Sequence, residues 1–157
     1  MTEGKVKARA RSLAFRYLAQ RPRSRAEMAL FLKKKEVPED AARETMADLE
    51  GYGYIDDRRF AADYGRYLLK RKCLSRFAVK SELARKGVDE ADIAPALDAL
   101  FGEDGEDEES IALRAATKKS ASLKGLDKEK ARRRLADHLR RRGFSFGIVL
   151  KTLKKFY

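Results

Sequence analysis

Few residues in the sequence are of the types that carry out catalysis. The one histidine, His138, and the one cysteine, Cys73, lie far apart in the chain, and neither has an identifiable nucleophile or base as a partner. The adjacent acids Asp56 and Asp57 could bind a metal or act as an acid–base pair, but a helix cap explains them more simply. The string Gly51-Tyr52-Gly53 lacks the third glycine and the preceding strand of a dinucleotide-binding loop, so it indicates the end of a helix. We therefore expect a protein that is not an enzyme and that holds no cofactor and no metal.

The basic residues are the second group able to act on a partner, because they attract polyanions and acidic protein surfaces. The 157 residues include 37 Lys and Arg against 25 Asp and Glu, a formal net charge of +12. Residues 1–102 carry +6 (22 basic, 16 acidic), residues 103–109 carry −6, and residues 110–157 carry +12 (15 basic, 3 acidic). The positive charge is therefore concentrated in the C-terminal third.

Two basic clusters contain the candidate binding residues. The first lies in the C-terminal third and consists of Lys118, Lys119, Arg132, Arg133, Arg140 and Arg141. The second lies in the middle third and consists of Arg66, Lys70, Arg71, Lys72 and Arg76. A charged run is usually a solvated helix face, and Asp137 stands at helical spacing from Arg133 and Arg141. However, the arginine triplets at 132–134 and 140–142 have few acids nearby, so we expect them to contact a polyanion or an acidic surface.

The residue mix indicates that helices position these side chains. The sequence contains 23 Ala and 18 Leu, against 5 Val, 4 Ile and 4 Thr. Alanine and leucine favour helices, whereas the scarce β-branched residues favour strands. With 43% hydrophobic residues the chain can also bury a core. The sequence therefore predicts an all-α fold.

The sequence also repeats itself along the chain. A shift of 51 residues places Ser24 on Ser75 and Leu32 on Leu83, and a further shift of 56 places Leu83 on Leu139. The apolar positions agree while the polar ones drift, as expected where only the buried face is specified. Apolar residues recur at helical spacing within each copy. We therefore expect three tandem units of three short helices each, in an elongated and curved row.

The expected units are bounded by glycines and by an acidic stretch. The first spans residues 1–55, the second 56–102 and the third 110–157, with an acidic linker over residues 103–109. The helices of the third unit are expected over residues 110–120, 127–142 and 145–157. Because three short helices bury little area, we expect neighbouring units to contribute to one another's core.

Capping residues mark where helices begin. Ser24 and Glu27 have the spacing of a capping box, and Ser75 is the equivalent cap in the second unit. Pro95 would kink a helix that began several residues before it, so we expect the third helix of that unit to begin after Asp92.

The cysteine count and the N-terminus predict the cellular compartment. A single cysteine excludes an internal disulfide and every multi-cysteine zinc site, and it suits a reducing compartment. No stretch approaches a membrane-spanning apolar run, and the N-terminal string MTEGKVKARARS lacks the apolar core of a signal peptide. We therefore expect a cytoplasmic monomer without a membrane partner.

Three strings of residues resemble those of a known family. Residues 51–61 have the sequence GYGYIDDRRFA, residues 82–88 have ELARKGV, and residues 139–144 have LRRRGF. In this order they resemble the signatures of the bacterial RecX regulatory proteins, and the resemblance extends from about Ala8 to Phe156. Two departures fall in turns. Residues 35–37 are KEV where Lys-Gly-Ile is usual, and residues 72–76 are KCLSR in place of a glycine-rich turn.

The resemblance implies a modulator of the RecA recombinase. RecX family members bind the RecA–DNA filament along its helical groove and typically restrain its ATP hydrolysis, strand exchange and co-protease activity. The implied partners are the RecA filament and single- or double-stranded DNA, without sequence specificity. The implied processes are DNA repair, recombination and the SOS response.

The alternative function is a helix-turn-helix regulator that acts directly on duplex DNA. Residues 24–49 and their copies contain two helices joined by a short turn. That mode requires base-reading side chains on the second helix of the pair, whereas Ala42, Met46 and Leu49 are expected in the core. A preference for RecA-coated DNA over a specific bare duplex would separate the two functions.

Overall fold

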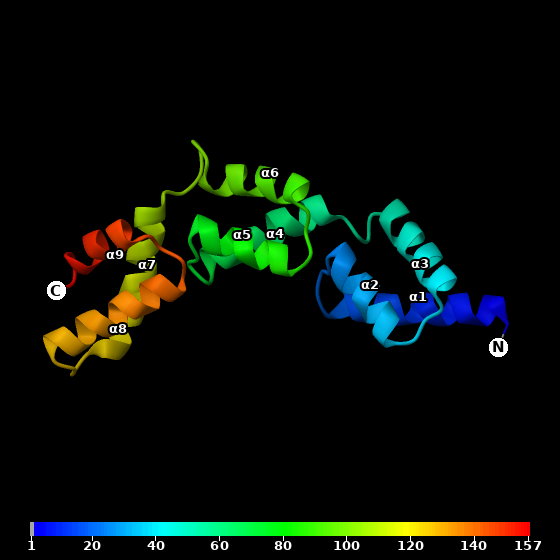
Figure 1. Ribbon diagram of the computed structural model, residues 1–157, viewed down its shortest axis with the longest axis horizontal. Coiled ribbons are helices and arrows are strands. Elements are labelled where there is room, and N and C mark those ends of the chain that lie inside the picture. The colour runs from blue at the N-terminus through cyan, green and yellow to red at the C-terminus, as the bar shows by residue number, and fades with distance from the viewer. Residues whose placement is uncertain (1) are drawn as a thin grey trace.

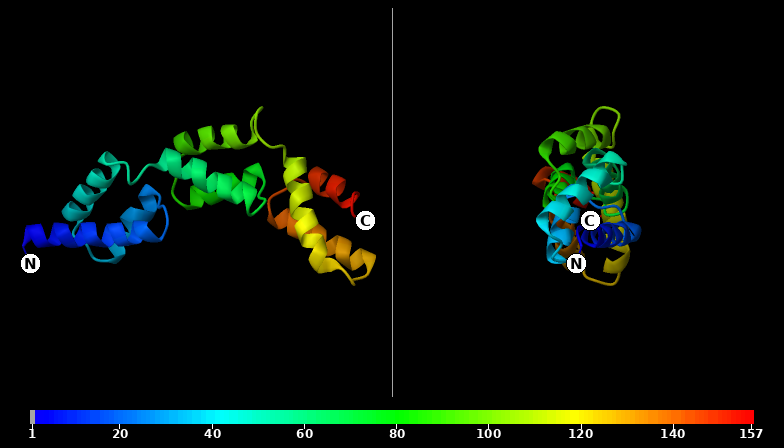
Figure 2. Two further views of the ribbon diagram at one scale, coloured as in Figure 1. Left: turned by 180° about the vertical axis from the view of Figure 1, so that it is seen from behind. Right: turned by 90° about the vertical axis from the view of Figure 1, so that its right-hand side faces the viewer.

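The structure is a computed structural model and describes residues 2–157. That part of the chain contains nine α-helices, one short 3-10 helix and no β-strand. The helices form three units in a bent row, and the two termini lie at opposite ends of the molecule (Figure 1). Viewed along the row, the three units largely overlap, so the molecule is long and narrow (Figure 2). The predicted all-α fold in an elongated, curved row is confirmed.

Each unit contains three α-helices. The first consists of α1 (Glu3–Gln20), α2 (Arg25–Lys34) and α3 (Glu39–Gly51), and the second of α4 (Asp57–Lys70), α5 (Arg76–Arg85) and α6 (Glu90–Phe101). The third consists of α7 (Glu108–Ser120), the 3-10 turn η1 (Ala121–Leu123), α8 (Lys128–Arg141) and α9 (Phe146–Leu153). The last helix was expected to end at Tyr157, but it ends at Leu153. Among the helices of residues 2–157, none is long and apolar enough to cross a membrane.

The apolar positions of the repeat form the cores of the units. Leu32, Leu83 and Leu139 are fully buried at equivalent places in α2, α5 and α8, which confirms the register of the three copies. Leu69 and Cys73 of the second unit pack into the core of the third. The core of the first unit contains residues of that unit alone. The expected sharing of core residues therefore occurs at the second joint between units and not at the first.

Capping residues set most helix starts. The capping box of α2 is complete, because Ser24 Oγ accepts from the Glu27 amide and Glu27 Oε1 accepts from the Ser24 amide, each at 3.1 Å. In the third unit α7 begins at Glu108, earlier than the expected Ser110. Asp107 caps it by accepting from the Ser110 amide at 2.8 Å. The last acids of the 103–109 stretch therefore lie in the first helical turn, where the helix dipole favours them.

The expected start of α6 after Asp92 is wrong. The helix begins at Glu90 and continues through Pro95. Because proline has no amide hydrogen, the carbonyl of Ala91 has no intrahelical donor. Arg58 of α4 donates from Nη2 to that carbonyl at 3.3 Å. A side chain from a neighbouring helix thus replaces the missing bond.

Among residues 2–157, two residues other than glycine have a left-handed backbone, and they lie at the two departures from the family pattern. The φ angle is +59° at Glu36 and +53° at Cys73. Glu36 occupies the place that Gly87 and Gly143 hold in the other units, where φ is +82° and +90°. Because a Cβ is strained in this conformation, the first unit carries a cost at this turn that Gly87 and Gly143 avoid at the equivalent turns.

We expect Glu36→Gly to stabilise the protein by about 1 kcal/mol. Glycine removes a left-handed strain of about 1–2 kcal/mol and adds some backbone entropy to the unfolded chain. Glu36→Ala removes the same exposed side chain but keeps the Cβ, so we expect no such gain from it. Denaturant midpoints of the three proteins measure the difference, and equal midpoints for the two variants would contradict the strain.

Candidate binding surfaces at the joints between units

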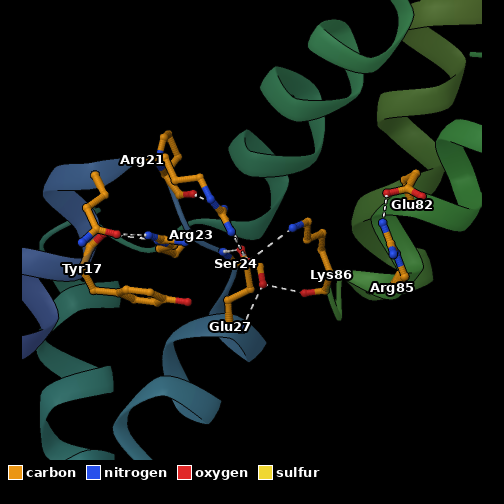
Figure 3. A network of polar contacts seen from close by, with 10 residues as sticks. Tyr17, Arg21, Arg23, Ser24, Glu27, Glu82, Arg85 and Lys86 are labelled. Atoms are coloured by element: carbon orange, nitrogen blue, oxygen red, sulfur yellow. Dashed lines mark hydrogen bonds and ion pairs between the residues drawn. The ribbon is translucent and has the colours of Figure 1, made fainter. Parts of the chain in front are cut away.

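The first joint is held by a polar network around Glu27 (Figure 3). Ser24 Oγ donates to the carbonyl of Lys86 at 2.6 Å. Glu27 Oε2 pairs with Arg21 Nη2 at 2.5 Å and with Lys86 Nζ at 3.6 Å. Burial alone would raise the pKa of Glu27, but hydrogen bonds from Arg21 and the Ser24 amide outweigh it and hold that pKa below its ordinary value. Glu27 is therefore ionised at neutral pH and connects the first unit to the second.

The second joint connects the equivalent residues one unit further along the chain, although the donor there is a backbone amide and not a hydroxyl. The amide of Ser75 donates to the carbonyl of Arg142 at 3.0 Å. A Cβ added to Gly143 would lie 2.4 Å from Ser75 Oγ, and one added to Gly87 at the first joint would lie 2.3 Å from Ala26 Cβ. At both joints a left-handed glycine of one unit thus packs against the capped start of a helix in the unit before it.

A hollow of about 190 Å³ opens beside the second joint, between the turn after α4 and the helices α7 and α8. Its wall contains no acidic residue and five basic ones: Arg71, Lys72, Lys118, Lys119 and Arg142. We call it the cationic hollow. Within residues 2–157 none of the five basic side chains lies in an ion pair. The hollow therefore concentrates positive charge that no acidic side chain of residues 2–157 neutralises in an ion pair.

Arg142 is the basic residue held most firmly in the cationic hollow. Its Nε donates to Nε2 of His138 at 2.8 Å, and its Nη1 donates to the carbonyl of Lys72 in the second unit. Arg142 therefore crosses from the third unit to the second, and its position depends on how the two units dock.

His138 lies in the wall of the cationic hollow and is half-buried. Burial and the positive charges of Arg142, Lys119 and Arg141 lower the pKa of His138 to about 4. The ring is therefore neutral at pH 7, and its Nε2 can accept the hydrogen bond from Arg142.

We expect part of the folding stability to be lost as the pH falls from about 6.5 to about 4. The unfolded ring takes up its proton near pH 6.5, while the folded ring does so only near pH 4, so protons favour the unfolded state between these values. His138→Gln keeps a hydrogen-bond acceptor but does not titrate. Urea unfolding of both proteins across this range measures the effect, and parallel stability curves would contradict the lowered pKa.

The remaining candidate residues lie outside the cationic hollow. Four of them pair with acids on the surface: Arg66 with Asp63, Lys70 with Glu106, Arg76 with Asp98, and Arg140 with Asp137. Such pairs contribute little to stability and lower the local charge. Arg132 and Arg133 line a shallow depression on the flank of α8 that faces α9, beside Leu153. Arg141 is exposed and unpaired within the described chain.

The structure regroups the two basic clusters of the sequence. Residues 71–72 and 118–119 belong to different clusters in the sequence, and the cationic hollow brings them together. The sequence included Arg142 only within the basic triplet 140–142 and not among the candidate site residues, and it gave no sign that His138 belongs to a site. One signal was present, because the shift of 56 residues that aligns the units places Lys86, at the first joint, on Arg142, at the second.

The contacts of Asp56 and Asp57 and the burial of Cys73 are those of residues that hold the fold together. Asp56 caps α4 by accepting from the Arg59 amide at 3.2 Å, and Asp57 accepts from the Arg25 amide at the start of α2 at 2.8 Å. Cys73 is buried beneath the turn after α4. Among residues 2–157 no group of three potential metal ligands occurs. The pair thus positions the starts of two helices.

Known proteins match this chain in sequence and in structure across all three units. The models described as RecX, first, second and third three-helix domain match residues 10–49, 56–97 and 106–153. Regulatory protein RecX of Streptomyces coelicolor is 37% identical over 146 residues, which are 93% of this chain and 76% of that protein. A crystal structure of a regulatory protein RecX has a TM-score of 0.72 at 25% identity, over 96% of this chain and 72% of that one. The crystal structure of RecX from Lactobacillus salivarius has a TM-score of 0.73 at 20% identity, over 97% of each chain. The three consecutive domain matches and this identity establish that the chain belongs to the RecX family of regulatory proteins.

Proposed function

We propose that the protein binds the RecA recombinase on DNA and restrains its ATP hydrolysis, strand exchange and co-protease activity. The observation that carries this proposal is the match of all three RecX domains, in order, along a bent row of three units. A long, narrow row can follow the groove of a filament over a greater length than a globule of the same mass. Its positive side chains can face both acidic protein surface and DNA phosphate.

This function requires binding alone, so we assign no catalytic step to the protein. We place it in the cytoplasm, in DNA repair, recombination and the SOS response, and propose that it acts as a monomer. The free, buried Cys73 supports a reducing compartment.

The charge of α3 weighs against a helix-turn-helix regulator. This helix would read the bases in the first unit, and its exposed side chains include Glu39, Asp40 and Glu44. DNA phosphates would repel these carboxylates. Met46 and Leu49 on the other face are buried and cannot reach base edges.

A charge-reversal variant tests the proposed function. We expect the combined change of Arg132, Arg133, Arg140 and Arg141 to Glu to weaken inhibition of RecA ATP hydrolysis at least about tenfold, a loss of about 1.4 kcal/mol in binding. Circular dichroism checks that the helix content is unchanged. A matched variant changes Lys5, Arg16, Lys33 and Lys34 of the first unit to Glu and alters the net charge equally.

The two variants together show whether inhibition depends on where the basic residues lie or only on the net charge of the protein. We expect the first-unit variant to retain most of its inhibition. If the third-unit variant inhibits RecA as strongly as the parent does, these arginines contribute only to solubility. The contact with RecA would then be placed at the turn after α4. Absence of inhibition by the parent protein in this assay would contradict the proposed function itself.

A further inference from the structure

We propose that the cationic hollow is a binding site for one phosphate group of a nucleic-acid backbone. The inference rests on the proposed function only in taking that phosphate from DNA. The site belongs to neither unit alone, because the second unit contributes Arg71 and Lys72 and the third contributes the other three basic residues.

The charges around the hollow point to an anionic ligand. A solvated charged face normally spreads its cations and intersperses acids, and many of the other basic residues of this chain do pair with acids. Here five cations without an acid converge on one small space. Their mutual repulsion is relieved when an anion enters, so binding an anion stabilises the docked arrangement of the two units.

The size and donors of the hollow fit a phosphate group. Its volume of about 190 Å³ lies below the roughly 300 Å³ at which small-molecule sites begin, so it is too small for a whole nucleotide. The bonds from Arg142 to His138 and to the Lys72 carbonyl orient its guanidinium in advance. Arginine and lysine donors arranged in this way are the usual partners of phosphate oxygens.

A nucleic-acid strand matches the charge better than an acidic protein side chain does. A carboxylate and a backbone phosphate each carry one negative charge, but a DNA strand presents its phosphates at a regular spacing of about 3.4 Å along the helix axis. One phosphate can therefore enter the hollow while its neighbours along the strand face exposed cations outside it. Arg141 at the end of α8 is such a cation, because it is exposed and does not line the hollow.

His138 provides a unique reporter of the occupied site, because it is the only histidine in the chain. The charged groups that face it are Lys118 and Lys119 from α7, Arg71 and Lys72 from the turn after α4, Arg141 at the end of α8, and Arg142 just after that helix. All are positive, so a bound anion offsets them and makes the protonated ring less costly. The pKa of His138 should therefore rise from about 4 when the hollow is filled.

The first experiment follows the ring signals of His138 by NMR as a function of pH. The probes are inorganic phosphate and a short oligodeoxythymidylate, each compared with chloride at equal ionic strength. We expect both probes to raise the pKa of His138 by about one pH unit or more. An unchanged pKa with saturating oligodeoxythymidylate would overturn the proposal, whatever inorganic phosphate does.

The second experiment measures affinity with matched charge-neutralising variants. We expect Lys72→Gln with Lys118→Gln to weaken binding of labelled oligodeoxythymidylate at least about fivefold at 0.1 M salt, and to lower the salt slope by about 0.7 per lost phosphate contact. Lys33→Gln with Lys34→Gln removes the same charge from exposed positions of α2 and is expected to change neither value. Equal losses in both variants would overturn the site.

A peptide arm separates nucleic acid from an acidic protein partner. At pH 7 we expect oligoglutamate of equal charge to bind at least about tenfold more weakly than oligodeoxythymidylate. Equal or tighter binding of the peptide would overturn the assignment to nucleic acid. Neither experiment contains RecA, so failure here leaves the proposed function standing, and failure of RecA inhibition leaves this site standing.

Discussion

Replacing Leu83 with alanine is expected to lower the free energy of unfolding by about 2–5 kcal/mol. Leu83 is fully buried on α5 in the core of the second unit, beside Val79 and Ile93. The substitution removes the apolar contacts of the leucine and leaves a cavity, which the surrounding side chains fill only in part. Because each unit has a small core, such a loss is a large fraction of its stability.

Denaturant midpoints measure this loss, and an exposed leucine provides the control. Leu30 on α2 is 53% exposed, so Leu30→Ala should change stability by no more than about 0.5 kcal/mol. If Leu83→Ala unfolded at the same denaturant concentration as the parent, the assignment of Leu83 to the core would be wrong.

The second large effect is expected at the joint between the second and third units. Gly143 has a φ of +90°, and a Cβ there would lie 2.4 Å from Ser75 Oγ and 2.9 Å from Ala78 Cβ. Gly143→Ala therefore adds a left-handed strain of about 1–2 kcal/mol and an overlap of about 1–3 kcal/mol. The overlap can be relieved only by moving the third unit away from α5.

Gly125 isolates the part of this effect that belongs to the joint. Its φ is also +90°, but no atom lies within 4 Å of an added Cβ. Gly125→Ala should therefore show the backbone strain alone, and the difference between the two variants reports the overlap. Small-angle scattering should detect an altered shape for Gly143→Ala only. Equal stability losses together with unchanged scattering would contradict the close packing at the joint.

Features that depend on nearby residues follow from the sequence alone. Helix content, the three copies, the burial of Leu32, Leu83 and Leu139, and the capping box at Ser24 were predicted correctly. Each is specified by residue type and by spacings of three or four positions, or by comparison of one copy with the next. The family signatures are also local strings, and the domain matches confirm the family that they indicate.

Features that depend on distant residues were decided by the tertiary structure. The helix α6 continues through Pro95 because Arg58, on another helix, donates to the carbonyl that proline leaves free. No local pattern around Pro95 contains that information. Similarly, Glu36 keeps the turn of the first unit without the glycine that its conformation favours, because the packing of α2 and α3 on either side determines the path of the chain.

The cationic hollow is the clearest case of this kind. The sequence shows that residues 71–72 and 118–119 are basic, but the spacing of apolar residues gives no distance between segments of different units. They meet because the second and third units dock through Gly143, Ser75 and the bonds of Arg142. Residue types and their spacing specify the three units and the charge that each one carries. The contacts between units decided where those charges converge, because such contacts join residues that no short-range pattern relates.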